Sequence, residues 1–275
     1  MALKAGVHPF SADPTIAWDH IKVHQTVQEV KLLKPDDPKP PGHTRFVCIS
    51  DTHSRTDALT IPEGDVLLHA GDFSDTGQPR DIEKFGRFLS TLPHQQKVLI
   101  AGNHDLTFDT QNYGTLWKRF RHPKQFDSKQ LKASISSLPN VTYLEDSGTT
   151  INGITIWGSP WQPEFCDWAF NLPRGKECLK KWDLIPEGTD IVMTHGPPVG
   201  HGDLCFHGAR AGCVDLLMTI QNRVKPKYHI FGHIHEGYGI TTDGTTVFVN
   251  CSVCTFNYKP INSPVIFDLP NSLSQ

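Results

Sequence analysis

The chain has 275 residues, a formal net charge of −3 and a hydrophobic content of 37%. This length fits one large domain or two small ones, and the composition is typical of a globular protein rather than a disordered or fibrous one. No apolar run approaches the ~20 residues that a membrane span requires. The slight acidic excess argues against a general nucleic-acid coat. Membrane proteins and small disulfide scaffolds are thereby excluded, and enzymes remain.

Cellular location is predicted from the N-terminus and the cysteines. The first residues form neither the apolar core of a signal peptide nor a myristoylation site with glycine at position 2. Seven cysteines, an odd number spread along the chain, indicate reduced thiols and predict a cytoplasmic protein. Cys251 and Cys254 have CxxC spacing, but no second pair completes a zinc site, so we interpret them as small residues near a strand end.

Residues 1–44 are weakly patterned and end in a proline-rich run at 33–42. This run predicts an extended lead-in that packs on a domain spanning residues 45–275. We assign the lead-in no function. The residues expected to pack on the domain are Ile16, Trp18, Ile21 and Val23.

From residue 45 onward, predicted strands alternate with predicted helices, which favours an α/β domain of mixed sheets covered by helices. Short continuous apolar runs predict strands buried on both faces at 46–49, 66–68, 98–100, 191–193 and 229–231. Helices are predicted at 79–91, 127–137, 174–182 and 209–223. Further strands, with hairpin turns at 152–153 and 243–244, are predicted at 141–144, 150–158, 245–249 and 265–267.

Polar motifs follow the five buried strands. Each motif alone is a weak signal, because an aspartate after a strand commonly caps a helix and Gly-Asp is a common turn pair. Together they predict one convergent site, since ligands gather at the carboxyl ends of strands in α/β folds and burying these groups unpaired would cost several kcal/mol. The motifs are Asp51-Thr52-His53, Gly71-Asp72, Gly102-Asn103-His104-Asp105, Thr194-His195 and Gly232-His233-Ile234-His235.

The donor types predict a metal centre. Imidazole and carboxylate groups without thiolate suit Mn, Fe, Zn or Co. Two ions bridged by Asp72 would leave a positive surplus that suits hydroxide and a phosphate ester. His104 is predicted to protonate the leaving group, with Asp105 orienting it. Seven candidate ligands are too many for one ion, and they are Asp51, His53, Asp72, Asn103, His195, His233 and His235.

This ordered set of motifs resembles the calcineurin-like metallophosphoesterase superfamily over residues 45–268, and the flanking residues resemble its metallophosphoesterase-domain-containing (MPPED-type) subfamily. The resemblance implies a four-layer α-β-β-α sandwich of two mixed sheets, with a dinuclear metal site at the carboxyl edge of the strands. One ion would be held by Asp51, His53, Asp72 and His235, and the other by Asp72, Asn103, His195 and His233.

The subfamily is similar to class III cyclic nucleotide phosphodiesterases. This similarity implies Mn²⁺ as the metal, with Fe, Zn or Co as alternatives, and a small phosphodiester or purine mononucleotide as the partner. Some relatives have glycine in place of His233 and are poorly active, so the histidine here predicts an active enzyme. Expected substrate contacts are Asn103, His104, His207 and His235.

We therefore predict a metal-dependent phosphodiesterase that hydrolyses a small phosphodiester, a cyclic nucleotide, by attack of a metal-bridging hydroxide with His104 as general acid. A nucleotide-binding scaffold with little turnover, a phosphomonoesterase and a nuclease on the same fold stay open. His207 is placed at the substrate rim, and Trp161 and Phe165 are candidates for base stacking against a default of core packing. The basic run 117–124 is interpreted as a solvated surface segment rather than a nucleic-acid patch.

Overall fold

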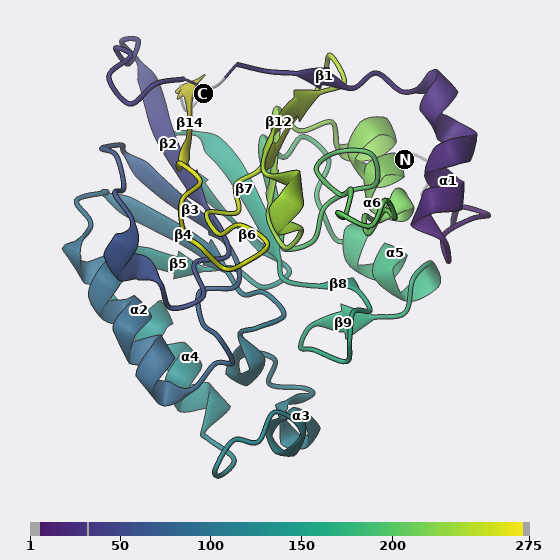
Figure 1. Cartoon of the computed structure of the whole chain (residues 1–275). Helices are drawn as coiled ribbons and strands as arrows, with labels where there is room; N and C mark the ends of the chain where they lie inside the picture. Colours follow the sequence, from purple (N-terminus) through teal and green to yellow (C-terminus); the bar gives the residue numbers. More distant parts are fainter. Residues whose placement is uncertain (1–5, 32, 272–275) are drawn as a thin grey trace.

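Figure 1 shows a computed structural model of the chain, which describes residues 6–31 and 33–271. Its first sheet has five strands in the order β14-β2-β3-β4-β5. Strands β2 to β5 run parallel, and β14 lies antiparallel to β2. The strand bounds are His43–Ile49 (β2), Val66–Ala70 (β3), Gln96–Ile100 (β4), Val141–Tyr143 (β5) and Val265–Pro270 (β14).

The second sheet has seven strands in the order β1-β12-β13-β11-β10-β7-β6. Its hairpins form where Asn-Gly and Asp-Gly predict them, and the first turn has positive φ at both Asn152 and Gly153, as a type I′ turn requires. The bounds are Gln28–Glu29 (β1), Ser147–Ile151 (β6), Ile154–Ser159 (β7), Ile191–Thr194 (β10), Tyr228–Phe231 (β11), Gly239–Thr242 (β12) and Val247–Asn250 (β13). A separate short pair joins Gln162–Pro163 (β8) to Asn171–Leu172 (β9).

The two sheets pack face to face around a continuous apolar layer that includes Leu68, Met193 and Val249. Helices α2 (Pro79–Thr91) and α4 (Ser128–Ser136) cover the outside of the five-stranded sheet. Helices α1 (Pro14–Ile21), α5 (Lys176–Trp182) and α6 (Val214–Thr219) lie outside the seven-stranded sheet (Figure 1). This arrangement confirms the predicted α-β-β-α sandwich.

Helix α6 begins later than its predicted start at residue 209. Residues 209–213 instead fold back on the preceding loop, where the main-chain N–H of Ala211 donates to Asp203 O at 3.0 Å and that of Cys213 to Pro197 O at 3.0 Å. The helix ends in a π-turn over Ile220–Val224. The predicted start of the helix was wrong because these hydrogen bonds join residues 8 to 16 positions apart, which helical periodicity does not reveal.

Two helices were not predicted. Helix α1 begins after Asp13, whose side chain accepts a hydrogen bond from the Ile16 N–H, and has proline at its first position. Helix α3 (Tyr113–Arg119) lies within the basic run. Short 3₁₀ turns are formed by Lys22–His24, Thr56–Ala58, Leu106–Phe108 and His235–Gly237. Among the described residues, no helix is long and apolar enough to cross a membrane.

Candidate metal centre

The motif residues meet at one edge of the two packed sheets. Asp51, Asp72 and Asn103 follow the neighbouring parallel strands β2, β3 and β4. His195 and His233 follow β10 and β11, which also run parallel. Because parallel strands end at the same edge, these turns bring the side chains together.

The turns that carry the site have unusual backbone conformations. Asp51, His53, Asp72 and His233 have φ values of 55°, 42°, 56° and 67°. Such left-handed conformations cost about 1–3 kcal/mol per residue and concentrate at functional sites. Main-chain hydrogen bonds hold the first turns in place, from Asp51 N to Gly71 O at 2.9 Å and from His53 N to Asp72 O at 3.0 Å.

Two motif glycines give the carboxylates room against the main chain. A Cβ at Gly102 would lie 2.3 Å from Asp72 Oδ1. A Cβ at Gly232 would lie 2.1 Å from Asp51 Oδ2. The glycines of the third and fifth motifs are therefore needed for the close approach of these carboxylates.

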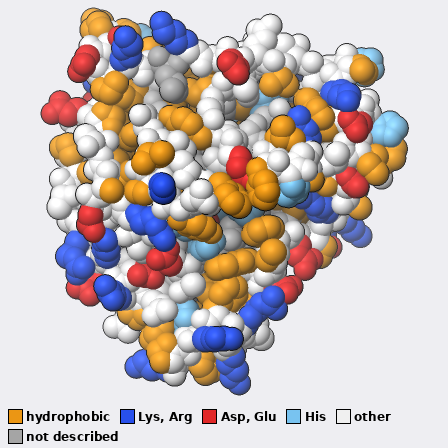
Figure 2. All heavy atoms as spheres, in the orientation of Figure 1, with side chains coloured by type: hydrophobic (Ala, Val, Ile, Leu, Met, Phe, Trp, Pro, Cys, Tyr) orange, Lys and Arg blue, Asp and Glu red, His pale blue; other side chains and the backbone are white. Residues whose placement is uncertain are grey.

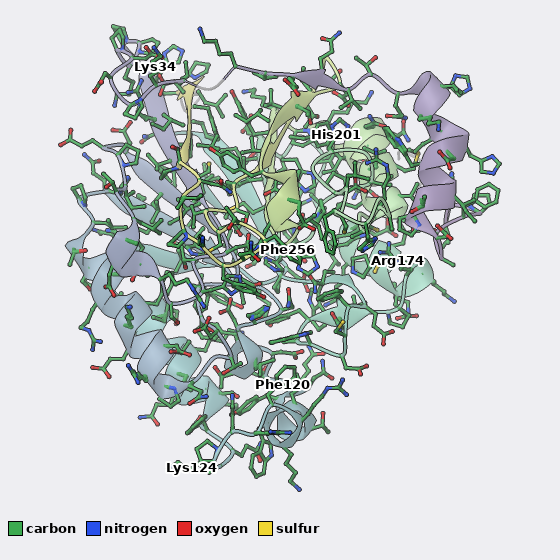
Figure 3. The ribbon with its side chains drawn as sticks, in the orientation of Figure 1. Lys34, Phe120, Lys124, Arg174, His201 and Phe256 are labelled. Carbon is green, nitrogen blue, oxygen red and sulfur yellow. The ribbon has the colours of Figure 1, made fainter. Side chains whose placement is uncertain are left out.

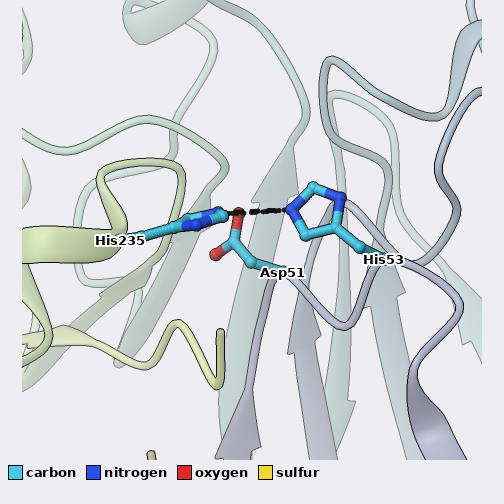
Figure 4. A group of neighbouring side chains, drawn as sticks. All are labelled: Asp51, His53 and His235. Carbon is cyan, nitrogen blue, oxygen red and sulfur yellow. Dashed lines mark hydrogen bonds and ion pairs between the residues drawn. The ribbon is translucent and has the colours of Figure 1, made fainter. Parts of the chain in front are cut away.

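The first group of donors consists of Asp51, His53 and His235, and Figure 4 shows the carboxylate between the two imidazoles. Asp51 Oδ1 lies 3.4 Å from His235 Nε2 and 4.0 Å from His53 Nε2. The two Nε2 atoms are 3.2 Å apart. Ring nitrogens that face each other across a carboxylate can direct both lone pairs at a cation.

The second group of donors consists of Asp72, His195 and His233. Asp72 Oδ2 lies 3.3 Å from His195 Nε2 and 3.8 Å from His53 Nε2. Asn103 Oδ1 lies 2.9 Å from His195 Nε2. Asp72 therefore lies between the two groups of donors.

The protonation states of two of the histidines suit cation binding. Burial lowers the pKa of both His53 and His233 to about 3, so both rings are neutral at neutral pH. Burial would raise the pKa of Asp51 and Asp72, but His235 and His195 respectively outweigh it and hold both carboxyls below their usual range.

Asp51 and Asp72 are 0% and 2% exposed, and no lysine or arginine in the described part of the chain pairs with either. Two buried carboxylates without a lysine or arginine partner fit divalent cations. The described groups can therefore hold metal ions.

Main-chain carbonyls orient two of the imidazoles. His195 Nδ1 lies 2.8 Å from Ala70 O, and His235 Nδ1 lies 3.0 Å from Thr255 O. If Nδ1–H donates to the carbonyl, Nε2 keeps its lone pair for a metal ion, an arrangement common among metal-ligating histidines.

The structure corrects the predicted role of Asp105. His104 Nδ1 lies 2.8 Å from the carbonyl oxygen of Asp75, not beside the Asp105 carboxylate. Asp105 accepts hydrogen bonds from Ser74 Oγ at 2.6 Å and from the Gly102 main chain at 2.8 Å. Burial and the nearby Asp72 raise the pKa of Asp105 to about 8, against the effect of these donors. Asp105 thus shapes the loop, because its side chain points back under the turn.

A pocket of about 270 Å³ opens beside the centre and contains the predicted His207 and Phe165. Trp161, the other stacking candidate, is buried and donates a hydrogen bond to Asp146, so it belongs to the core. Figure 2 shows hydrophobic side chains beside histidines near the middle of this face, and Figure 3 labels Phe256 there. Phe206 lines the pocket beside the predicted His207, whereas no sequence motif marked two further aromatic residues of the rim, Phe256 and Tyr258.

Two other regions contribute none of the motif residues. Phe120 and Lys124 of the basic run lie in the lower part of the molecule in Figure 3, where Phe120 packs on Trp168 with ring centroids 4.3 Å apart and Arg119 pairs with Asp167 at 2.7 Å. A groove of about 1130 Å³ between α2 and α4 contains none of the motif residues. The motif residues therefore converge on the smaller pocket.

Known proteins resemble this chain over most of its length. It is 50% identical to human metallophosphoesterase domain-containing protein 1, covering 96% of this chain and 84% of that protein. It is 24% identical to a 3′,5′-cyclic-nucleotide phosphodiesterase of Nostoc over 64% of this chain and 58% of that protein. One solved structure, 16% identical, shares the fold with a TM-score of 0.55 and covers 84% of this chain and 100% of its own.

The model of the calcineurin-like phosphoesterase family matches residues 44–237, which include all five motifs. This match agrees with the centre described above, where histidines and aspartates from both sheets meet. The chain belongs to the calcineurin-like phosphoesterase family.

Proposed function

We propose that this protein is a metal-dependent phosphodiesterase that hydrolyses a small phosphodiester, a cyclic nucleotide. The main support is the position of Asp72 between two groups of donors, with His104 beside it. Asp72 Oδ1 accepts a hydrogen bond from the His104 main-chain N–H at 2.7 Å, which ties the acid residue to the centre.

The proposed ligands form two overlapping sets. Asp51, His53, Asp72 and His235 bind one ion, and Asp72, Asn103, His195 and His233 bind the other. When bound, two divalent ions, for which we propose Mn²⁺, supply a nucleophile from water at neutral pH and neutralise charge on the phosphate. The chain's own part is to hold the neutral imidazoles and the carboxylates in place before substrate arrives.

His104 is the proposed general acid. Its ring stacks on Trp168 with centroids 4.0 Å apart and meets the His53 ring edge-on at 4.5 Å. The Asp75 carbonyl oxygen lies 2.8 Å from Nδ1 and orients the ring when Nδ1 carries a proton. Packing on two sides fixes the direction in which Nε2–H is presented to the leaving oxygen.

The pocket lining supports a small ester with a flat apolar group. Phe165, Phe206 and Phe256 are 47%, 72% and 52% exposed, although large aromatic side chains are usually buried. Among the described residues, Glu236 lines the pocket and no lysine or arginine does, although the Arg55 guanidinium lies 5.3 Å from the centroid of the Tyr258 ring. A polynucleotide or nucleoside triphosphate would bring further negative charge to a rim with few basic groups. The name of the Nostoc relative agrees with a cyclic nucleotide.

The first test compares a diester with a monoester. The protein is stripped with chelator, Mn²⁺ is restored, and hydrolysis of bis(p-nitrophenyl) phosphate is compared with that of p-nitrophenyl phosphate. Faster diester turnover that depends on metal supports the proposal, and 2′,3′- and 3′,5′-cyclic nucleotides are tested next. Preference for the monoester would indicate a phosphatase, and stoichiometric metal without turnover a binding protein.

His104→Ala tests the general acid. We expect the rate for esters with poor leaving groups to fall by about 100-fold or more, because these need a proton on the departing oxygen. Esters of p-nitrophenol need little protonation and should be affected much less. An equal loss for both leaving groups would contradict the role, and His24→Ala, an exposed histidine, is the control.

A further inference from the structure

We propose that helix α1 positions the substrate rim and that Trp18 is the positioning residue. The rim concerned is the loop of residues 200–212, called the rim loop below. Its tip, Cys205 to His207, lines the pocket beside the metal centre. The kinetic part of this proposal rests on the proposed function, and the structural part does not.

The base of the rim loop is closed by one buried carboxylate. Asp203 Oδ1 accepts from the Gly200 N–H at 3.0 Å, and Oδ2 accepts from the Gly212 N–H at 3.2 Å. Arg210 pairs with the same carboxylate. Asp203 is 0% exposed, so the loop base depends on keeping this ion pair and its hydrogen bonds intact.

Helix α1 covers this base directly. The Arg210 guanidinium lies 4.5 Å from the centroid of the Trp18 ring, and the Arg210 N–H donates to Thr15 Oγ1 at 3.0 Å. A Cβ at Gly200 would lie 2.0 Å from the Trp18 ring, so the indole packs on the bare main chain of the loop. Trp18 therefore covers both Arg210 and the first residue of the rim loop, and limits access of water to the ion pair.

The segment that carries α1 is itself anchored at both ends. Before the helix, Ser11 Oγ donates to Asp215 Oδ2 at 2.6 Å, and the His8 N–H donates to Asp215 Oδ1 at 2.8 Å. After the helix, β1 pairs with β12, with Gln28 opposite Thr242. Helix α1 is thus held in place on both sides, and the rim loop packs against it.

The tip of the rim loop is a turn closed by its own main chain, in which the Cys205 N–H donates to Ala209 O at 3.0 Å and the Gly208 N–H donates to Cys205 O at 2.8 Å. Its contacts with other segments are few and include the Phe206 ring against Phe256, with centroids 4.8 Å apart. The Phe206 N–H donates to Glu236 Oε1 at 3.2 Å, and Phe206 and Leu204 are 72% and 49% exposed. A tip with this much exposed apolar surface does not hold its own position by burial. Its placement over the pocket therefore depends on the base that α1 covers.

Trp18→Ala tests the proposal by kinetics. We expect KM for bis(p-nitrophenyl) phosphate to rise about threefold to fivefold. The value of kcat should stay within about twofold, because the centre lies on other loops. KM for methyl p-nitrophenyl phosphate, which lacks the second ring, should not change. In Trp18→Phe, KM for bis(p-nitrophenyl) phosphate should stay close to the wild-type value, because the phenyl ring can still cover Arg210. Ile16→Ala, at a 45% exposed position of the same helix, should leave KM unchanged.

Hydrogen exchange supplies a readout that needs no turnover. In Trp18→Ala, amides of residues 200–212 should exchange faster, while those of residues 51–54 should be unchanged. Thr15→Val, which removes the hydroxyl that Arg210 contacts, should act in the same direction and is the alternative if Trp18→Ala does not fold. Unchanged exchange in the rim loop would overturn the proposal, as would a fall in kcat with KM unchanged. A wild-type protein without phosphodiesterase activity would contradict only the proposed function.

Discussion

The two sheets contribute to the centre in different ways. The five-stranded sheet presents Asp51, His53, Asp72 and Asn103 on turns that directly follow its strands. The seven-stranded sheet presents His195, His233 and His235 as well, but it also leads into the segments that line the pocket. These segments contain Phe165 after β7, Cys205 to His207 after β10, and Phe256 with Tyr258 after β13.

The donor groups thus lie on short strand-end turns, whereas the pocket lining lies mostly on longer loops. Short turns with positive φ are held by neighbouring strands and by glycines that touch the carboxylates, so little can move there. The longer loops have only the short β8–β9 pair or isolated bridges such as that between Leu204 and Arg210, so they depend on side-chain contacts and on helix α1. We therefore expect changes in the strand-end turns of either sheet to affect the chemical step, and changes in the longer loops to affect binding or loop stability.

Asp72→Asn should have the largest effect, because this carboxylate lies between both groups of donors. We expect the rate to fall by more than about 100-fold. Loss of a residue that only supports a metal ligand already costs about 10-fold to 100-fold, and Asp72 is a proposed ligand itself. Bound metal, measured by elemental analysis, should fall as well. Asp57→Asn, at an exposed carboxylate paired with Lys84, is the control and should change neither quantity.

His233→Gly should separate activity from stability. The ligand is lost, so we expect a fall in rate of about 10-fold to 100-fold. Because His233 has a φ of 67°, glycine relieves backbone strain and the melting temperature should not fall. His233→Ala loses the same ring but keeps the strained backbone, and should melt at a lower temperature than the glycine variant. An unchanged rate in the glycine variant would refute the ligand role.

The stability of the protein should depend on pH through His201, which lies in the rim loop. Burial lowers the pKa of this ring to about 4, Asp243 opposing and Arg210 reinforcing the shift. Above the unfolded pKa of about 6.5 its contribution to stability is complete. As pH falls toward 4, the unfolded chain takes up a proton that the folded chain does not, and stability is lost by about 1.4 kcal/mol per pH unit.

His201→Gln should flatten this slope. The free energy of unfolding, measured by urea denaturation at several pH values from 7 to 4, should fall less steeply in the variant by about 1.4 kcal/mol per pH unit. The slopes are compared rather than the absolute stabilities, because the substitution also removes the ring that stacks on Phe248 at 3.8 Å. Parallel curves would contradict this expectation, because they would show that His201 takes up its proton as readily in the folded protein as in the unfolded chain.

Phe256→Ala should have the smallest effect and should act on binding alone. Loss of one stacking face for a base costs about 1 kcal/mol, so KM for a cyclic nucleotide should rise about fivefold with kcat unchanged. Ile261→Ala removes an apolar side chain that is 71% exposed and does not line the pocket, which makes it the matched control. Equal effects of the two variants would place the nucleotide elsewhere.

The sequence pattern by itself determined the buried strands alternating with helices and the convergence of the polar motifs, whereas the four layers followed from the resemblance to the family. Continuous apolar runs must be buried on both faces, and polar motifs directly after them must therefore lie at one sheet edge. For Asp51, Asp72 and His195, position in the chain and position in space are linked by a single strand end. The hairpin turn at Asn152 and Gly153 followed in the same way, because its backbone conformation depends on those two residues.

Only the tertiary structure decided which residues surround that centre. Asp105 is adjacent to His104 in sequence, yet its carboxylate points under the turn, and the carbonyl of Asp75 contacts the ring instead. Trp18 and Tyr258 carry no local signal, because their partners lie far along the chain. Strand periodicity and turn chemistry are local properties, whereas the fit of a loop against a helix depends on packing between distant segments.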